Sequence, residues 1–299
     1  VLLGGDGDDS ITGGGGNDTL IGGSGSDTFV FNRGDGVDRI YDNAGENKVL
    51  EFGSGIAPAD ITLGLGSLML SVGDDAVHIE NFDRNNVFAA PVIDVFRFAD
   101  GTELTYSQII ARGFDINGSE WGDNLAGTNA NDRINGLDGD DWLDGGAGND
   151  ALNGGTGNDI YFFGIGYGKD TIADTDIMSG NTDVVVMQNV LPGDVSVSRG
   201  RDYLNISIIG TQDVLAIRWA PLEGYQIEQI QFADGTVWDA AMLEMLAGNE
   251  IVDINDAPTV ATPIADQTTV EDATFSFTVP ADTFTDIDNG DVLTYSVVL

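Results

Sequence analysis

The chain has 299 residues, of which 11 are basic and 50 acidic, and its formal net charge is −39. Nucleic acids and anionic membrane surfaces bind clusters of lysine and arginine, so this balance excludes both as expected partners. Cysteine is absent, which excludes disulfides, a thiolate nucleophile and a zinc–cysteine site. No apolar run reaches the roughly 18 residues that a membrane-spanning helix needs, so we expect no membrane span. Hydrophobic residues make up 41%, which is enough for a core.

The first 30 residues repeat with a period of nine. An aspartate recurs at Asp9, Asp18 and Asp27, and a large apolar residue follows each of them two positions later. The same pattern returns further along the chain, with aspartates at Asp123, Asp132, Asp141, Asp150 and Asp159. Both residue types stay in register over eight copies, so chance does not explain the pattern.

Glycines surround these aspartates at the second and fourth positions of most repeats. They are Gly5, Gly7, Gly14, Gly16, Gly23, Gly25, Gly139, Gly146, Gly148, Gly155 and Gly157. Glycine adopts backbone angles that are closed to other residues and lets carbonyl oxygens face inward. Calcium prefers about six to eight oxygen ligands at about 2.3–2.6 Å, which carbonyls and aspartates supply. We therefore predict that these glycines and the repeat aspartates bind several Ca²⁺ ions.

The nonapeptide pattern GGxGxDxUx resembles the RTX or haemolysin-type calcium repeat, and this resemblance implies which aspartates meet. It implies that six residues of each nonapeptide turn and three extend, and that two nonapeptides make one coil, so alternate turns stack at a strand spacing of roughly 4.8 Å. Pairs expected to share an ion are Asp9 with Asp27, Asp123 with Asp141, Asp132 with Asp150, and Asp141 with Asp159. Trp121 replaces the fourth-position glycine before Asp123, which predicts a weaker site there. Without calcium we expect a flexible glycine-rich chain, because so thin a core cannot offset chain entropy.

The resemblance to RTX repeats also implies parallel β-rolls in a protein of type I secretion. A longer similarity surrounds the short one, because residues 29–42 align with 161–174 at an offset of 132, and 98–102 with 232–236 at an offset of 134. We therefore predict two tandem units.

After the repeats, alternating apolar residues predict strands at 48–52, 68–72 and 183–187. Thr105 begins a capping box, and Asp239 is an expected N-cap, so each unit is predicted to close with a short helix. These parts resemble the haemolysin-type calcium-binding-related segment, which implies a role in extending and capping the roll. Further acids bind another ion or are ordinary turn residues, and both interpretations stay open: Asp35, Asp38, Asp42, Asp170 and Asp174.

The composition changes after Gly248. Residues 253–258 resemble a cadherin inter-domain linker, and residues 254–299 resemble the first half of a bacterial, dystroglycan-type cadherin-like domain. That resemblance implies metal ligands at Asp253, Asn255, Asp256, Asp286 and Asp288. The last two are alternatively turn residues. Such sandwiches need about 100 residues, so we expect a partial domain and a piece of a longer protein.

The predicted fold is therefore all-β. Two parallel β-rolls are expected at 1–30 and 117–162, β-rich capping modules at 31–116 and 163–249, and a linker with part of an Ig/cadherin-like β-sandwich at 250–299.

The sequence favours a protein that is not an enzyme. The single histidine, His78, lies in a strand-like run, and neither HExxH nor GxSxG occurs. We predict a calcium-binding structural or spacer region of a large secreted or cell-surface adhesin or exoprotein, which folds on exposure to extracellular calcium. One alternative is a calcium-dependent module that binds surface polysaccharide or another cell-surface protein, with Trp142 as a contact. Another is the non-catalytic tail of a secreted hydrolase.

Overall fold

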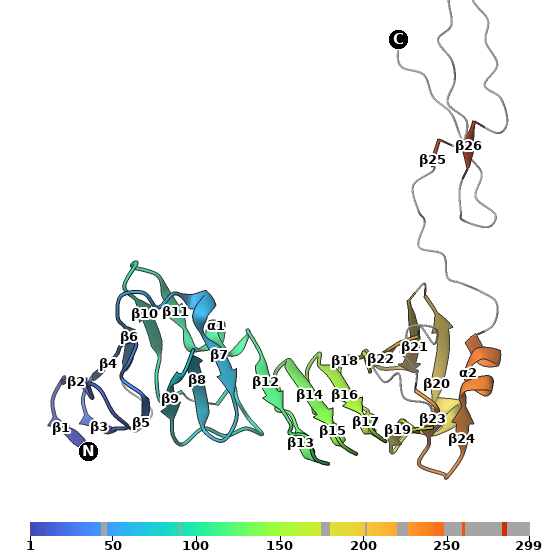
Figure 1. Ribbon diagram of the computed structural model, residues 1–299, viewed down its shortest axis with the longest axis horizontal. Coiled ribbons are helices and arrows are strands. Elements are labelled where there is room, and N and C mark those ends of the chain that lie inside the picture. The colour runs from blue at the N-terminus through green and yellow to red at the C-terminus, as the bar shows by residue number, and fades with distance from the viewer. Residues whose placement is uncertain are drawn as a thin grey trace, which may run out of the picture.

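The computed structural model describes residues 1–42, 47–89, 91–174, 180–200, 202–219, 227–247, 259–260 and 283–285. Within these residues the chain is all-β apart from four short helices. The strands stack along one long axis (Figure 1), with β1 at one end and β20 to β24 toward the other. No helix among these residues is long and apolar enough to span a membrane.

The first unit consists of two sheets. One has the order β1-β3-β5-β9-β8-β7 and the other β11-β10-β6-β4-β2. The strands are β1 Leu2–Asp6, β2 Ser10–Thr12, β3 Thr19–Ser24, β4 Thr28–Phe31, β5 Val37–Tyr41, β6 Val49–Phe52, β7 Thr62–Gly64, β8 Leu68–Val72, β9 Asp75–Ile79, β10 Val95–Phe98 and β11 Glu103–Thr105. A 3-10 helix, η1 Pro58–Asp60, precedes β7, and α1 Tyr106–Ile110 follows β11.

The second unit repeats this order. Its sheets run β12-β14-β16-β18-β22-β21-β20 and β13-β15-β17-β19-β23-β24. The strands are β12 Phe114–Asn117, β13 Asn124–Ala126, β14 Asp132–Asp138, β15 Trp142–Asp144, β16 Ala151–Thr156, β17 Ile160–Gly164, β18 Lys169–Ile172, β19 Val184–Gln188, β20 Val195–Arg199, β21 Tyr203–Ile208, β22 Val214–Arg218, β23 Gln229–Gln231 and β24 Val237–Asp239. The helices are η2 Pro192–Asp194 and α2 Ala240–Ala247.

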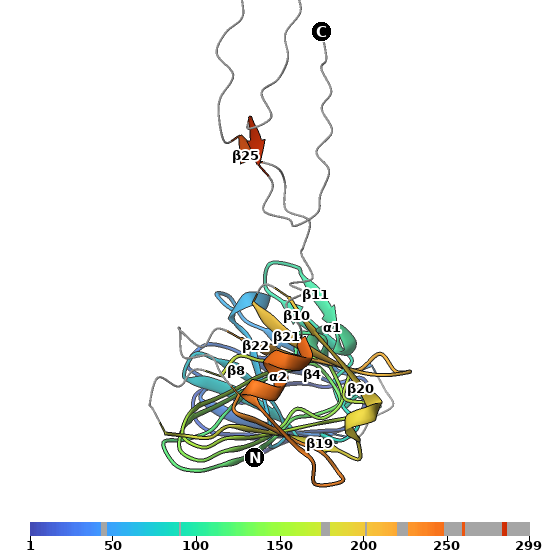
Figure 2. The same ribbon diagram turned by 90° about the vertical axis from the view of Figure 1, so that its right-hand side faces the viewer.

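Strand register confirms the predicted coil. Leu2 pairs with Leu20, and Leu125 with Leu143, both in parallel, so each strand pairs with the one two nonapeptides later. Viewed along the long axis (Figure 2), successive turns overlie one another. The two predicted parallel β-rolls are thus present.

The core lies between the two sheets of each unit. Within the repeats it is thin, because each short strand buries little more than the apolar residue of its nonapeptide, such as Leu20 or Leu152. Larger side chains fill it where the repeats end. Phe29 and Tyr161 are fully buried there, and Phe52 stacks on Phe98 with 5.0 Å between ring centroids.

The sheets continue from the repeats into the following modules without a break. β5 and β9 extend the sheet of β1 and β3 in parallel, and only then does the pairing turn antiparallel, at β9 with β8. Likewise β12 spans the boundary expected at residues 116 and 117, since Phe114 pairs with Asp132 in the second roll. Each module is therefore an extension of its roll.

Both predicted helix starts are confirmed. Thr105 caps α1, with its Oγ1 accepting a hydrogen bond from the Gln108 N–H at 3.3 Å. Asp239 Oδ1 accepts one from the Met242 N–H at 2.8 Å, at the start of α2. As predicted, β8 occupies 68–72, while β6 and β19 fall within one residue of their expected bounds.

In the C-terminal part, β25 Thr259–Val260 pairs antiparallel with β26 Phe284–Thr285. The five ligands predicted there lie outside the described residues: Asp253, Asn255, Asp256, Asp286 and Asp288.

Candidate metal centre

The repeat aspartates form two ladders, one along each edge of the rolls. In each rung, the backbone N–H of one aspartate donates to Oδ1 of the aspartate two turns later. The N to Oδ1 distances are 3.0 Å for Asp9 with Asp27, 2.7 Å for Asp123 with Asp141, 2.7 Å for Asp132 with Asp150 and 2.8 Å for Asp141 with Asp159. The structure thus brings together all four predicted pairs.

The ladders continue beyond the nonapeptides. The N–H groups of Asp18 and Asp150 donate to Oδ1 of Asp38 and Asp170, both at 2.9 Å. Asp38 and Asp170, for which two interpretations were open, are therefore further rungs. Asp35 lies in a turn, where its Oδ2 accepts a hydrogen bond from the Asn32 N–H at 2.8 Å.

Sequence reasoning missed one rung, Asp183, whose Oδ1 accepts from the Asp159 N–H at 2.8 Å. It lies 24 residues after Asp159 rather than 18. The only sequence signal was its place as the first residue of the predicted strand 183–187, directly before the apolar run 184–187, because each repeat aspartate also comes shortly before the apolar residue of its own strand.

The second carboxylate oxygen of many rungs is buried and accepts no hydrogen bond. This holds for Oδ2 of Asp9, Asp38, Asp141, Asp150, Asp159 and Asp170. Carboxylates removed from water without a compensating partner are costly. A cation between successive turns would compensate them, and an all-oxygen donor set suits Ca²⁺.

The first glycine of each nonapeptide makes room for this oxygen, a role that the sequence did not single out. A Cβ on Gly136 would lie 2.1 Å from Asp141 Oδ2, and a Cβ on Gly154 would lie 2.1 Å from Asp159 Oδ2. The second and fourth glycines have the positive φ that was expected, with φ 106° at Gly23 and φ 127° at Gly25.

In two turns the Oδ2 of the repeat aspartate does accept hydrogen bonds, and the donors are protein groups. Asp123 Oδ2 accepts from Ser119 N–H and Oγ at 2.6 and 2.8 Å. Asp132 Oδ2 accepts from Thr128 N–H and Oγ1 at 2.5 and 3.0 Å. Ser119 and Thr128 stand where other repeats have the second glycine, so these two carboxylates depend least on a cation.

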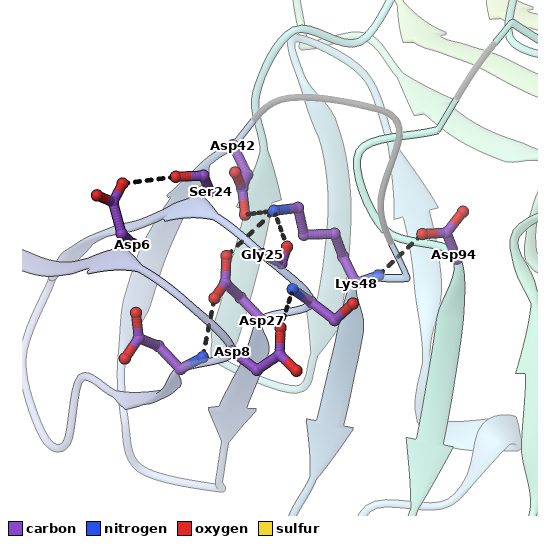
Figure 3. A network of polar contacts seen from close by, with 10 residues as sticks. Asp6, Asp8, Ser24, Gly25, Asp27, Asp42, Lys48 and Asp94 are labelled. Atoms are coloured by element: carbon purple, nitrogen blue, oxygen red, sulfur yellow. Dashed lines mark hydrogen bonds and ion pairs between the residues drawn. The ribbon is translucent and has the colours of Figure 1, made fainter.

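Asp27 is a third special case. Its Oδ2 lies 3.1 Å from the Lys48 ammonium nitrogen, and both side chains are buried. Burial lowers the pKa of Lys48, but hydrogen bonds to Asp27 and Asp42 outweigh that effect, so the pKa lies above its ordinary value. The lysine therefore carries its positive charge at the end of the ladder that contains Asp9 and Asp27 (Figure 3).

Burial raises the pKa of four rungs of the second unit. Mainly through desolvation, the pKa rises to about 8 for Asp150, about 7 for Asp159, about 7 for Asp170 and about 9 for Asp183. Neighbouring carboxylates add to the shift, since like charges disfavour ionisation. A bound divalent cation would reverse both effects.

Family profiles identify these turns. The profile described as RTX calcium-binding nonapeptide repeat (4 copies) matches residues 1–29 and 126–161. The chain carries RTX calcium-binding repeats. A second profile, haemolysin-type calcium binding protein related domain, matches residues 204–242. A third, putative Ig domain, matches residues 257–298. The Ig-type match agrees with a sandwich domain there, while its cadherin-like character stays a prediction.

No curated protein sequence matches the chain significantly. Among solved structures, the extracellular lipase LipA from Serratia marcescens matches with 18% identity and a TM-score of 0.29, over 76% of this chain and 38% of the lipase. The chain thus spans well under half of that lipase. The AlgE6R3 subunit of the Azotobacter vinelandii mannuronan C5-epimerase matches with 25% identity and a TM-score of 0.25, over 51% of this chain and 94% of the subunit.

Proposed function

We propose that this RTX region is a non-catalytic, calcium-dependent structural and spacer segment of a secreted adhesin or exoprotein. Its rolls fold when Ca²⁺ ions enter the aspartate ladders. The rungs proposed to hold these ions include Asp9, Asp38, Asp141, Asp150, Asp159 and Asp170, with carbonyl oxygens of the glycine turns.

The observation that supports this proposal most strongly is the row of buried Oδ2 atoms without hydrogen-bond donors. The thin core of the repeats cannot hold so many carboxylates together against their desolvation and mutual repulsion. Ions that bind the folded chain and not the unfolded one stabilise it by mass action. Calcium is therefore expected to act as the folding switch.

The switch suits passage from a cell to its surroundings. At low cytosolic calcium the acidic repeats stay unfolded, and an unfolded chain passes through a secretion channel. Outside, calcium at millimolar concentration neutralises the ladders and drives folding. Dissociation constants of about 10⁻⁴–10⁻³ M, as in other extracellular modules, match that function. A chain that folds at cytosolic calcium concentrations would contradict the proposal.

The exposed aromatic residues of the second roll favour a second candidate, calcium-dependent binding of a carbohydrate. Trp142 is 51% exposed on β15, and its ring lies 5.9 Å from that of Phe162 on neighbouring β17. Trp121 is 78% exposed in the turn before β13. Flat aromatic faces of this kind stack on sugar rings. Trp219 and Trp238, by contrast, are buried in the module.

Glycan-array binding tests this second candidate. Binding that disappears on addition of chelator, and also in Trp142→Ala, would support it. If the calcium-loaded chain binds no polysaccharide, or if Trp142→Ala binds as well as the original chain, the carbohydrate proposal is wrong and the structural role stands alone.

A further inference from the structure

A buried lysine lies at one end of the ladder that contains Asp9 and Asp27. Lys48 is one of only two lysines in a chain with 50 acidic residues. The residue is almost completely buried, with 1% of its surface exposed. Its Nζ lies 2.8 Å from the Gly25 carbonyl oxygen and 3.1 Å from Oδ2 of both Asp27 and Asp42 (Figure 3). Burying an ammonium group is costly unless it is paired and hydrogen-bonded. These three oxygens therefore form a built cation site that the protein's own ammonium fills.

The second unit contains the same site with a different residue in the lysine's place. Val49 pairs with Thr28 in the first unit, and Val184 pairs with Ile160 in the second, so Lys48 and Asp183 precede equivalent strands. Their backbones are held alike. The Lys48 N–H donates to Asp94 Oδ2 at 2.9 Å, and the Asp183 N–H donates to Glu228 Oε2 at 2.7 Å. A carboxylate thus stands where the first unit has an ammonium group.

The other members of the site are acids in both units. Asp27 and Asp42 of the first unit correspond to Asp159 and Asp174 of the second. The three acids of the second unit are all buried, and one carboxylate oxygen from each lies within 4.8 Å of the others. Asp159 is fully buried, and its Oδ2 accepts no hydrogen bond. Three carboxylates around one point, with a third acid in place of the ammonium group, suit a cation of higher charge than a single ammonium.

We propose that Asp159, Asp174 and Asp183 bind a Ca²⁺ ion at the position that the Lys48 ammonium occupies in the first unit. The net charges of the two sites agree. One ammonium group with two carboxylates leaves a single negative charge in the first unit, and one divalent cation with three carboxylates leaves the same charge in the second. The first unit therefore closes its last turn without metal, whereas the second unit requires an ion there. This inference rests on the proposed function, since it extends calcium binding beyond the nonapeptides.

Reciprocal substitutions in the full chain test the inference by the number of Ca²⁺ ions bound at saturation, measured by equilibrium dialysis. Asp183→Lys is expected to bind one ion fewer than the original chain, and Lys48→Asp one ion more. Asp202→Lys and Lys169→Asp change the charge equally at exposed positions, so both should leave the count unchanged. Far-UV circular dichroism in saturating calcium checks that each variant is folded.

Asp183→Asn supports the test if Asp183→Lys does not fold. It keeps the shape of the side chain but removes one negative charge, and it should lower the ion count by one or raise the calcium midpoint at least tenfold. Unchanged counts and midpoints in the folded Asp183 variants would overturn the inference while leaving the proposed function intact. An original chain that binds no calcium would overturn both.

Discussion

At the scale of single residues, the first glycine of each nonapeptide matters for the space it leaves rather than for its backbone angles. Gly154 has an ordinary φ, yet a Cβ there would lie 2.1 Å from Asp159 Oδ2 and 2.6 Å from the Tyr161 hydroxyl oxygen. Tyr161 is fully buried, so it has little room to move. The carboxylate and any ion it holds would have to shift instead.

Gly154→Ala is therefore expected to weaken calcium binding and to destabilise the calcium-loaded chain by about 1–3 kcal/mol, as for other overpacked sites. Urea denaturation in saturating calcium measures the loss. Gly193→Ala is the matched control, because a Cβ on Gly193 meets nothing within 4 Å. It should change the free energy of unfolding by less than about 0.5 kcal/mol. Equal stability of the two variants would contradict the role assigned to Gly154.

Leu137 supports a prediction of the opposite sign. It stands at the second position of its repeat, where the fold requires a positive φ, and it adopts φ 84° without being glycine. A non-glycine residue there costs roughly 1–2 kcal/mol, while glycine adds some entropy to the unfolded chain. Leu137→Gly should therefore stabilise the calcium-loaded chain by about 0.5–1 kcal/mol in urea denaturation. Leu137→Ala keeps the Cβ and should give no such gain, and a gain from alanine would refute the argument.

The nonapeptide motif predicted the aspartate pairs and the positive φ of the second and fourth glycines, because both follow from a fixed period. It did not predict the contacts of Lys48 and Asp183. These residues follow the last repeat of each unit after connections of unequal length, so the offset of 132 that relates the units no longer applies. Only the pairing of β6 and β19 with their neighbours reveals the correspondence.

At the scale of elements, local signals were sufficient for the helices. The Thr105 capping box and the Asp239 cap depend on residues three positions apart, and both form as expected. Strand pairing was harder to predict. Alternation identified β8 and β19 as strands, but it contains no information about partners. Consequently the change from parallel to antiparallel pairing at β9 and β22 was not foreseen.

Thr105→Ala tests the contribution of one such element. The substitution removes the side-chain acceptor of the Gln108 N–H and should cost about 1 kcal/mol of stability, as is typical for N-cap residues. Thr105→Ser keeps the hydroxyl and should stay within about 0.5 kcal/mol of the original chain. Thermal denaturation in saturating calcium compares the three chains. Identical melting temperatures for alanine and threonine would show that the cap contributes nothing.

At the scale of the whole molecule, the net charge of −39 is concentrated in part along the ladders. In the metal-free folded chain the pKa values of Asp150 and Asp159 are about 8 and about 7, whereas an unfolded chain has ordinary values near 3.8. Folding without metal therefore takes up protons between these limits. The contribution of the protonated rungs to the free energy of unfolding of the metal-free chain is present at low pH and is lost as the pH rises through about 7–8.

This linkage predicts opposite pH responses with and without metal. In chelator, the β signal in far-UV circular dichroism should be larger at pH 5 than at pH 8. With calcium, protons compete for the same carboxylates, so the calcium midpoint should rise as the pH falls from 8 to 5. A metal-free β signal that grows with pH would contradict the raised pKa values and with them the buried, uncompensated state of the ladders.

A calcium titration followed by far-UV circular dichroism tests the central claim most directly, with magnesium and with sodium chloride of equal ionic strength as controls. The account predicts a cooperative gain of β signal at near-millimolar calcium. Neither control should reproduce it, because screening by salt acts on exposed charges and magnesium demands a stricter geometry than these ladders offer. A chain that is fully folded in chelator at pH 8 would show that calcium does not hold the rolls together, and the proposed switch would be wrong.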